Sequence, residues 1–113
     1  MSTLSTHVLD TSLGRPAAGV AVTLERREAG TFIELGRGRT DADGRCRELL
    51  PSGVTLQLAA YRLRFDTGSY YGERGIVTFY PQVCVEFVVH DPSKHHHVPL
   101  LLSPFGYSTY KGS

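Results

Sequence analysis

The sequence has no tryptophan, only one methionine and only two cysteines, Cys46 and Cys84. It also lacks an excess of charge of one sign, because the formal net charge is +1 at pH 7 and acidic and basic residues are interspersed. Nucleic-acid-binding proteins usually present a basic face, so we expect no nucleic-acid partner. No apolar run approaches the roughly 20 residues that a membrane-spanning helix needs, so we expect no membrane partner either.

The N-terminus lacks the features of a secretory signal. The segment MSTLSTHVLD has neither a basic start nor an apolar stretch of about 7–15 residues, and we therefore expect a cytoplasmic protein. In a reducing cytosol, Cys46 and Cys84 are expected to remain free thiols. Cys84 falls within a predicted strand. Because free cysteines are commonly buried, we expect Cys84 to be a small packing residue rather than a nucleophile.

No stretch of the sequence sustains a helical period. Short β-branched runs are separated by Gly, Pro, Asp and Ser, a pattern typical of a β-sandwich or barrel. With 113 residues the chain has room for one core, so we expect a single domain, residues 1–113, of two packed antiparallel sheets. One short helix is predicted up to Gly72, capped by Asp66 or Thr67. Strands are predicted over 4–9, 20–25, 31–36, 45–49, 56–65, 83–90, 95–102 and 105–110.

The C-terminal stretch KHHHVPLLLSPFGYSTYKGS, residues 94–113, carries most of the candidate chemistry. Loose tails are usually poor in large apolar groups. This one contains three leucines, a phenylalanine and two tyrosines, so we expect it to be packed and its terminus held in place. Pro99 cannot donate to a strand ladder. It is therefore expected at a sheet edge, at a bulge, or with its missing donor directed away from a neighbour.

Strand alternation places several polar side chains on one face. If Val8 and Val98 face the core, then His7 and His97 face outward, and Tyr110 shares that outer phase. Two leucines also share it, and an outer face that combines Leu, His and Tyr is typical of an interface. We therefore expect self-association, with the histidines lying between subunits.

Two features of the sequence leave alternatives open. His95 and His97, at i and i+2 on a strand, have a spacing that can hold zinc with His7 as a third ligand. No Cys or acidic cluster adds a further convincing ligand, however. An arginine near the central Asp-Ala-Asp-Gly turn is a candidate anion clamp. Spacing does not choose among the four arginines of that region, Arg37, Arg39, Arg45 and Arg47.

Four stretches carry a resemblance to a known family: LSTHVLD, TDADGR, FYPQVCVEF and HHVPLLLSPFGYSTYKGS. Together they resemble the transthyretin-related 5-hydroxyisourate hydrolases over nearly the whole chain, and the C-terminal motif is the specific part, because transthyretins lack this ending. The resemblance implies an all-β fold, a transthyretin-like β-sandwich of two four-stranded antiparallel sheets with one short helix. It also implies a homotetramer, a dimer of dimers with active sites in a channel at the dimer–dimer interface.

The activity that the resemblance implies is hydrolytic opening of 5-hydroxyisourate, the product of urate oxidation, to 2-oxo-4-hydroxy-4-carboxy-5-ureidoimidazoline. It implies no metal and no organic cofactor. Lys111 stands where the family usually has Arg, and lysine lacks the planar fork that binds a carboxylate from two donors. His96 stands where the family often has Tyr. Carried over by position, the catalytic residues are His7, Arg45, His97 and Ser113, and the substrate-binding residues are His7, Arg45 and Tyr110.

These residue types suit hydrolysis of a cyclic amide. The unperturbed histidine pKa of about 6.5 lies near working pH, so either His7 or His97 suits the role of general base, and the sequence does not decide between them. Arg45 would bind the attacked carbonyl or its oxyanion. The main alternative is a transthyretin-like small-ligand binding protein without catalysis. A zinc-dependent hydrolase and a structural sandwich module are the other two.

Overall fold

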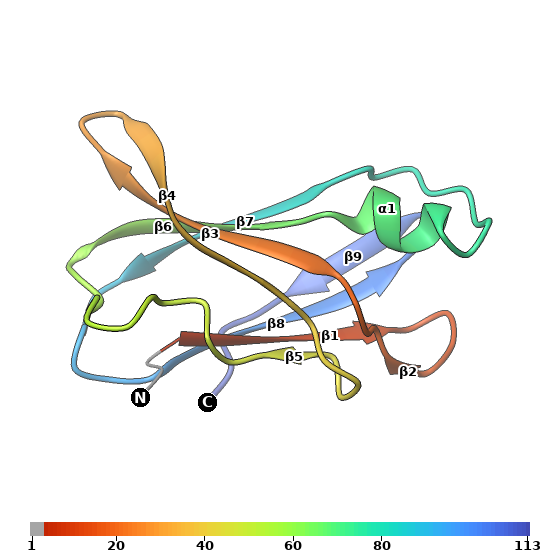
Figure 1. Cartoon of the computed structure of the whole chain (residues 1–113), viewed down its shortest axis with the longest axis horizontal. Helices are drawn as coiled ribbons and strands as arrows, with labels where there is room; N and C mark the ends of the chain where they lie inside the picture. The colour runs from red at the N-terminus through yellow and green to blue at the C-terminus, as the bar shows by residue number, and fades with distance from the viewer. Residues whose placement is uncertain (1–3) are drawn as a thin grey trace.

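The computed structural model describes residues 4–113 and shows two β-sheets packed face to face, with a short helix at one end of the sandwich (Figure 1). The start of the first strand and the C-terminus lie at the opposite end. This confirms the predicted all-β sandwich with one short helix. The elements are β1 (Leu4–Asp10), β2 (Arg15–Pro16), β3 (Ala21–Glu28), β4 (Thr31–Arg39), β5 (Arg45–Cys46), β6 (Ala59–Phe65), α1 (Thr67–Gly72), β7 (Val83–Val89), β8 (His96–Ser103) and β9 (Gly106–Thr109).

The four-stranded sheet has the order β4-β3-β6-β7 and is antiparallel throughout, as predicted. The side chains of β7 alternate between the two faces, so that Val83, Val85 and Val89 face the core. Cys84 lies on the opposite phase, and its thiol is free and exposed. The prediction that Cys84 is a small, buried packing residue was therefore wrong, because the period of two in β7 places it on the outer face. Cys46, also a free thiol, is the buried one.

The other sheet has five strands, not four, and it is not wholly antiparallel. Its order is β2-β1-β8-β9, with β5 also paired to β1. β1 and β8 run parallel, from the pair Leu4 and His96 to the pair Asp10 and Leu102. The prediction of two four-stranded antiparallel sheets was thus wrong for this sheet. Side-chain alternation reveals which face a residue takes but carries no information on the direction of its neighbour, and two-residue strands leave no periodic signal.

Pro99 lies inside a central strand, because β8 is flanked by β1 and β9. The regular β8–β9 ladder ends at the pair Leu100 and Thr109, and the Thr109 hydroxyl donates to the Pro99 carbonyl at 2.7 Å. Pairing resumes at an isolated bridge between His97 and Gly112. The position of the missing Pro99 amide donor therefore coincides with an interruption of the β8–β9 ladder. Pro99 does not lie at a sheet edge, which was one of the three placements expected.

The helix α1 closes one end of the sandwich. The Asp66 side chain accepts a hydrogen bond from the Ser69 amide, which confirms Asp66 as its N-cap. Six residues do not form a stable helix alone. Packing holds this one, since Tyr70 and Tyr71 are buried and the Tyr70 hydroxyl donates to the buried Asp10 carboxylate of β1 at 2.9 Å. Burial together with this hydrogen bond raises the pKa of Tyr70 to about 12.

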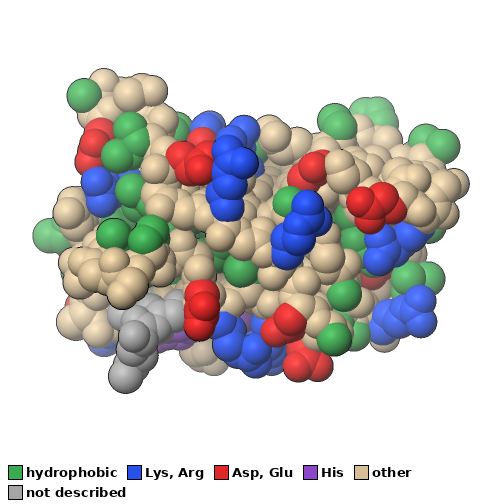
Figure 2. All heavy atoms as spheres, in the orientation of Figure 1, with side chains coloured by type: hydrophobic (Ala, Val, Ile, Leu, Met, Phe, Trp, Pro, Cys, Tyr) green, Lys and Arg blue, Asp and Glu red, His purple; other side chains and the backbone are tan. Residues whose placement is uncertain are grey.

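The surface agrees with the mixed composition. Lysine and arginine side chains alternate with aspartate and glutamate on the face that Figure 2 displays. Within residues 4–113, no helix is long and apolar enough to cross a membrane.

Candidate active site

The outer face of the five-stranded sheet brings the predicted histidines together. Along β1 the burial alternates, with Thr6 and Val8 inside and His7 half-buried on the other side. Across the parallel β1–β8 ladder, Ser5 lies opposite His97, and His7 follows two residues further along β1. Residues opposite each other in a ladder share a face. His7 and His97 therefore lie on one face of adjacent strands, which confirms the strand-phase prediction.

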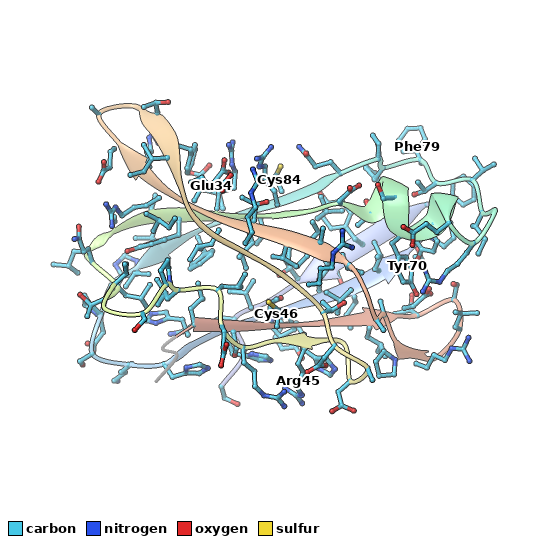
Figure 3. The ribbon with its side chains drawn as sticks, in the orientation of Figure 1. Glu34, Arg45, Cys46, Tyr70, Phe79 and Cys84 are labelled. Atoms are coloured by element: carbon cyan, nitrogen blue, oxygen red, sulfur yellow. The ribbon has the colours of Figure 1, made fainter. Side chains whose placement is uncertain are left out.

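The short strand β5 adds Arg45 to this face. Arg45 lies opposite His7 in the antiparallel β1–β5 pair, and directly opposed residues have Cβ atoms about 4.5–5.5 Å apart. In Figure 3, Arg45 points away from the sandwich, whereas Cys46 beside it points between the sheets. Three of the predicted residues, from β1, β5 and β8, thus converge.

The Asp-Ala-Asp-Gly turn fixes the approach of β5. The Asp41 carboxylate accepts hydrogen bonds from the amides of Asp43 (2.9 Å) and Arg45 (3.0 Å), and these amides hold the pKa of Asp41 below its usual value. Gly44 has φ +76°, and a Cβ there would lie 2.4 Å from the Val8 carbonyl oxygen. Only glycine fits both conditions, so the turn sequence itself places Arg45 next to His7.

Hydrogen bonding distinguishes the four arginines that spacing left equivalent. The Arg37 guanidinium binds Glu34 at 2.7 Å, Arg39 donates to the Gly19 carbonyl at 3.1 Å, and Arg47 pairs with Asp41 at 3.1 Å. Within residues 4–113, no side-chain or backbone acceptor binds the Arg45 guanidinium. Its five N–H donors remain open to a ligand.

His97 lies in an environment that favours its neutral form. Burial lowers its pKa, and the positive charges of Arg45, His7 and His95 lower it further. Among the described residues, the charged side chains that shift the pKa of His97 are all basic. A neutral imidazole keeps one nitrogen lone pair and can accept a proton from water near pH 7.

Ser5 is a residue of this site that the sequence analysis missed. Its hydroxyl oxygen lies 2.8 Å from Nδ1 of His97 and 2.9 Å from Nε2 of His95. The available signal was phase, because Ser5 precedes His7 by two residues and so shares its face of β1.

The C-terminal segment lies against His97. The Gly112 amide donates to the His97 carbonyl at 2.8 Å, and a Cβ on Gly112 would lie 2.6 Å from Cδ2 of the His97 ring. Tyr110 shares the phase of Gly112, and its side chain is 59% exposed. Ser113, which is exposed, follows directly. The chain end is therefore held beside the histidine, as expected.

The expectation that the whole C-terminal stretch is packed was only partly right. Leu100 and Leu102 are buried in the core. Phe105 and Tyr107, by contrast, are 69% and 42% exposed. Large apolar side chains predict that a surface will be covered by something, but they do not show whether the same chain or another one covers it.

Two further sequence questions have answers in the structure. The buried His96 is satisfied locally, because its Nδ1 lies 2.9 Å from the Lys94 carbonyl, to which a ring N–H donates. Across the described residues, no three His, Cys, Asp or Glu side chains form a group that could hold a metal ion. The zinc alternative with His7, His95 and His97 therefore gains no support from the geometry.

The fold and this face define a class of protein: a two-sheet β-sandwich with histidine and arginine side chains gathered on the outer face of one sheet. The chain belongs to the HIUase/Transthyretin family, whose profile matches residues 4–112. A 5-hydroxyisourate hydrolase of Mus musculus is 48% identical over 115 residues, which cover 99% of this chain and 96% of the relative.

Solved structures of both branches of the family are similar to this one. The 5-hydroxyisourate hydrolase of Klebsiella pneumoniae superimposes with a TM-score of 0.86 at 38% identity, covering 100% of each chain. Sea bream transthyretin in complex with thyroxine gives a TM-score of 0.90 at 32% identity, covering 97% of this chain and 94% of that one. Backbone similarity alone therefore does not separate hydrolase from carrier, and the side chains of the site must decide.

Proposed function

We propose that the protein hydrolyses 5-hydroxyisourate to 2-oxo-4-hydroxy-4-carboxy-5-ureidoimidazoline, without a metal or organic cofactor. The observation that carries this proposal is the unpaired Arg45 guanidinium beside His7 and His97 on one face. Such a set of donors and proton acceptors suits a small polar heterocycle. The names of the relatives point to the same substrate.

His97 is the general base in this proposal. Its neutral imidazole accepts a proton from water, and the resulting hydroxide adds to the attacked carbonyl carbon of the ring. Arg45 binds the oxygen that becomes negatively charged, and within residues 4–113 no carboxylate is hydrogen-bonded to its guanidinium. The carbon–nitrogen bond then breaks, and the proton held by His97 passes to the leaving nitrogen, so that one water molecule is consumed and the histidine returns to its neutral state.

The remaining candidates have supporting roles in this scheme. His7, opposite Arg45, binds the substrate and acts as a proton shuttle. Tyr110 binds the substrate from the segment that lies against His97. Ser113 contributes its hydroxyl or the terminal carboxylate to orient the histidine or the water. Support for these two roles is the hydrogen bond between Gly112 and His97, which holds the chain end at the site.

The same proposal includes a homotetramer, built as a dimer of dimers. Support comes from β7 and β9, which within residues 4–113 are unpaired edge strands of their sheets along one side of the sandwich. A groove of about 390 Å³ lies between those edges. Unpaired edges commonly bind a second chain, and the exposed aromatic side chains of Phe79 and Phe105 add apolar surface. Light scattering that gives a monomer at assay concentration would contradict this part of the proposal.

We also propose that the reaction takes place in the cytoplasm. The support is chemical, since Cys46 and Cys84 are both free thiols, the state expected in a reducing compartment.

A direct assay tests the activity. Fresh 5-hydroxyisourate, generated from urate by a urate oxidase, is followed in the ultraviolet with and without the protein. We expect decay far faster than the spontaneous reaction at protein concentrations well below that of substrate. A binding protein would change the signal only in proportion to the protein added, so a lack of turnover would instead support the carrier alternative. Deletion of residues 111–113 should abolish turnover while the tetramer persists.

A further inference from the structure

Ser5 connects two histidines through one hydroxyl group. Its Oγ lies 2.8 Å from Nδ1 of His97 and 2.9 Å from Nε2 of His95, both ordinary hydrogen-bond lengths. His97 is half-buried, and His95 is exposed to solvent just before β8 begins. The three side chains form a short chain of hydrogen bonds from the outer face to the solvent.

A hydroxyl group carries one proton, so Ser5 can donate to only one of the two rings. If it donates to His97, then Nδ1 of that ring is bare and its Nε2 carries the proton. If it donates to His95, then Nδ1 of His97 carries the proton and donates to Ser5, and Nε2 is bare. Only the second arrangement leaves His97 a lone pair at the nitrogen that Ser5 does not occupy.

We propose that Ser5, with His95 as its acceptor, is a positioning residue that holds neutral His97 in the Nδ1–H tautomer, so that Nε2 is the proton acceptor. The catalytic consequence rests on the proposed function, because it assumes that His97 is the base, but the tautomer itself does not. In this role Ser5 does not contact the substrate; it affects the reaction only by orienting the ring of His97 and fixing its tautomer.

The surroundings of His97 favour this arrangement. Burial lowers the pKa of His97, and the Ser5 backbone raises it by a smaller amount, as an acceptor beside a ring N–H would. The charged groups that face the ring are Arg45, His7 and His95, all basic, together with the C-terminal segment. With no carboxylate among those that shift its pKa, a neutral ring has Ser5 as its one side-chain partner at Nδ1 within residues 4–113.

The test reads the tautomer directly. Proton–nitrogen correlation spectra of 15N-histidine-labelled protein at pH 7.5 distinguish a protonated ring nitrogen from a bare one. In the wild-type protein we expect His97 to show Nδ1–H and bare Nε2. In Ser5→Ala we expect a mixture of tautomers, whereas Ser5→Thr, which keeps the hydroxyl, should restore the wild-type signals. Ser52→Ala, the same change at an exposed turn serine, is the control.

Kinetics provide the second readout. Ser5→Ala should lower kcat by about tenfold, less than the 10²–10⁴-fold effect typical of losing a general base, while KM changes by less than about twofold. Wild-type His97 protonated at Nε2 would overturn the proposal even if no variant folds. So would a Ser5→Ala protein whose His97 signals match the wild type. If the wild-type protein shows no hydrolysis, the spectra still decide the tautomer, so the two proposals fail separately.

Discussion

The two outer faces of the sandwich treat charge in opposite ways. On the four-stranded sheet, the Glu25 side chain is 8% exposed, and its carboxylate accepts a hydrogen bond from Nε of Arg62 at 2.6 Å and forms an ion pair with Nε of Arg64 at 3.3 Å. On the five-stranded sheet, Arg45 lies beside a group of histidines, and within residues 4–113 no carboxylate forms a hydrogen bond or ion pair with its guanidinium. The charges of the first face are paired with one another, whereas the basic groups of the second face are not paired with a carboxylate in direct contact.

The difference separates structural charges from functional ones. When a buried carboxylate lies between two guanidinium groups, their positive charges offset the cost of its burial, so its role is in the stability of the fold. On the other face, burial lowers the pKa of His97 and the basic groups beside it lower that pKa further, so this arrangement costs stability. A site that binds and polarises a carbonyl oxygen needs this arrangement. Changes on the two faces should therefore affect different properties of the protein.

The largest effect is expected at His97. Replacement by Asn keeps a polar atom near the Nδ1 position, where Ser5 binds, but removes Nε2. We expect kcat/KM for 5-hydroxyisourate to fall by about 10²–10⁴-fold, with little change in the free energy of unfolding. The ultraviolet assay measures this loss, and His90→Ala, at an exposed histidine just after β7, is the matched control. A His97→Asn protein within tenfold of wild-type activity would remove His97 from the role of base.

Arg45→Gln should come next. Loss of a preorganised donor to a developing oxyanion typically costs about 10²–10³-fold in kcat, and we expect that range here. Because the Arg45 guanidinium has no partner to lose, the free energy of unfolding should stay the same or rise. Arg47→Gln, which removes a guanidinium paired with Asp41, is the control and should retain activity. Equal losses of activity in the two variants would mean that Arg45 is not special among its neighbours.

The pH dependence of Arg45→Gln gives a sharper form of the same test. In the wild-type protein, burial and the charge of Arg45 lower the pKa of His97, so the neutral base persists below the ordinary histidine pKa of about 6.5. Removing the positive charge makes protonation easier and raises that pKa. The acid limb of the kcat/KM profile should therefore move to higher pH. If the acid limb stays in place or moves to lower pH, the charge of Arg45 does not lower the pKa of the catalytic base, and this part of the proposal is wrong.

On the opposite face, Glu25→Gln should destabilise the fold and leave the chemistry intact. The variant leaves Arg62 and Arg64 without their carboxylate, and breaking a fully buried pair costs about 3–5 kcal/mol. Both arginines keep contact with solvent, so we expect a loss of about 2 kcal/mol. Denaturant unfolding at fixed protein concentration measures it, and Glu34→Gln, at an exposed pair with Arg37, should have a smaller effect. A variant with normal stability and lost turnover would contradict the division between the two faces.

Sequence alone predicted the outer face because alternation in β1 and β8 is a local property. His7 and His97 follow from phase, and the Asp41 turn follows from its own residues. Phase also places Ser5 on the face of His7, but its contact with His97 depends on the register between β1 and β8. Spacing did not distinguish Arg45 from its neighbours, because its place opposite His7 depends on the register between β1 and β5, and only the family resemblance pointed to it. The five-stranded mixed sheet and the exposure of the Cys84 thiol were missed for a related reason. Whether two strands pair in parallel or antiparallel, and whether other parts of the chain cover a sheet face, depends on the whole fold and not on a short stretch of sequence.

The smallest effect is expected at Lys111, in the C-terminal segment. Gly112 pairs with His97, so Gly112 and Tyr110 share the outer phase and Lys111 takes the opposite one. Lys111 lines the groove between β7 and β9 together with Glu86, and His97 and Tyr110 line the same groove. Because arginine keeps the positive charge and the phase of Lys111 is opposite to that of Tyr110, Lys111→Arg should change kcat/KM by no more than about twofold, or about 0.4 kcal/mol. A gain of tenfold or more would show that the side chain at this position contacts the substrate.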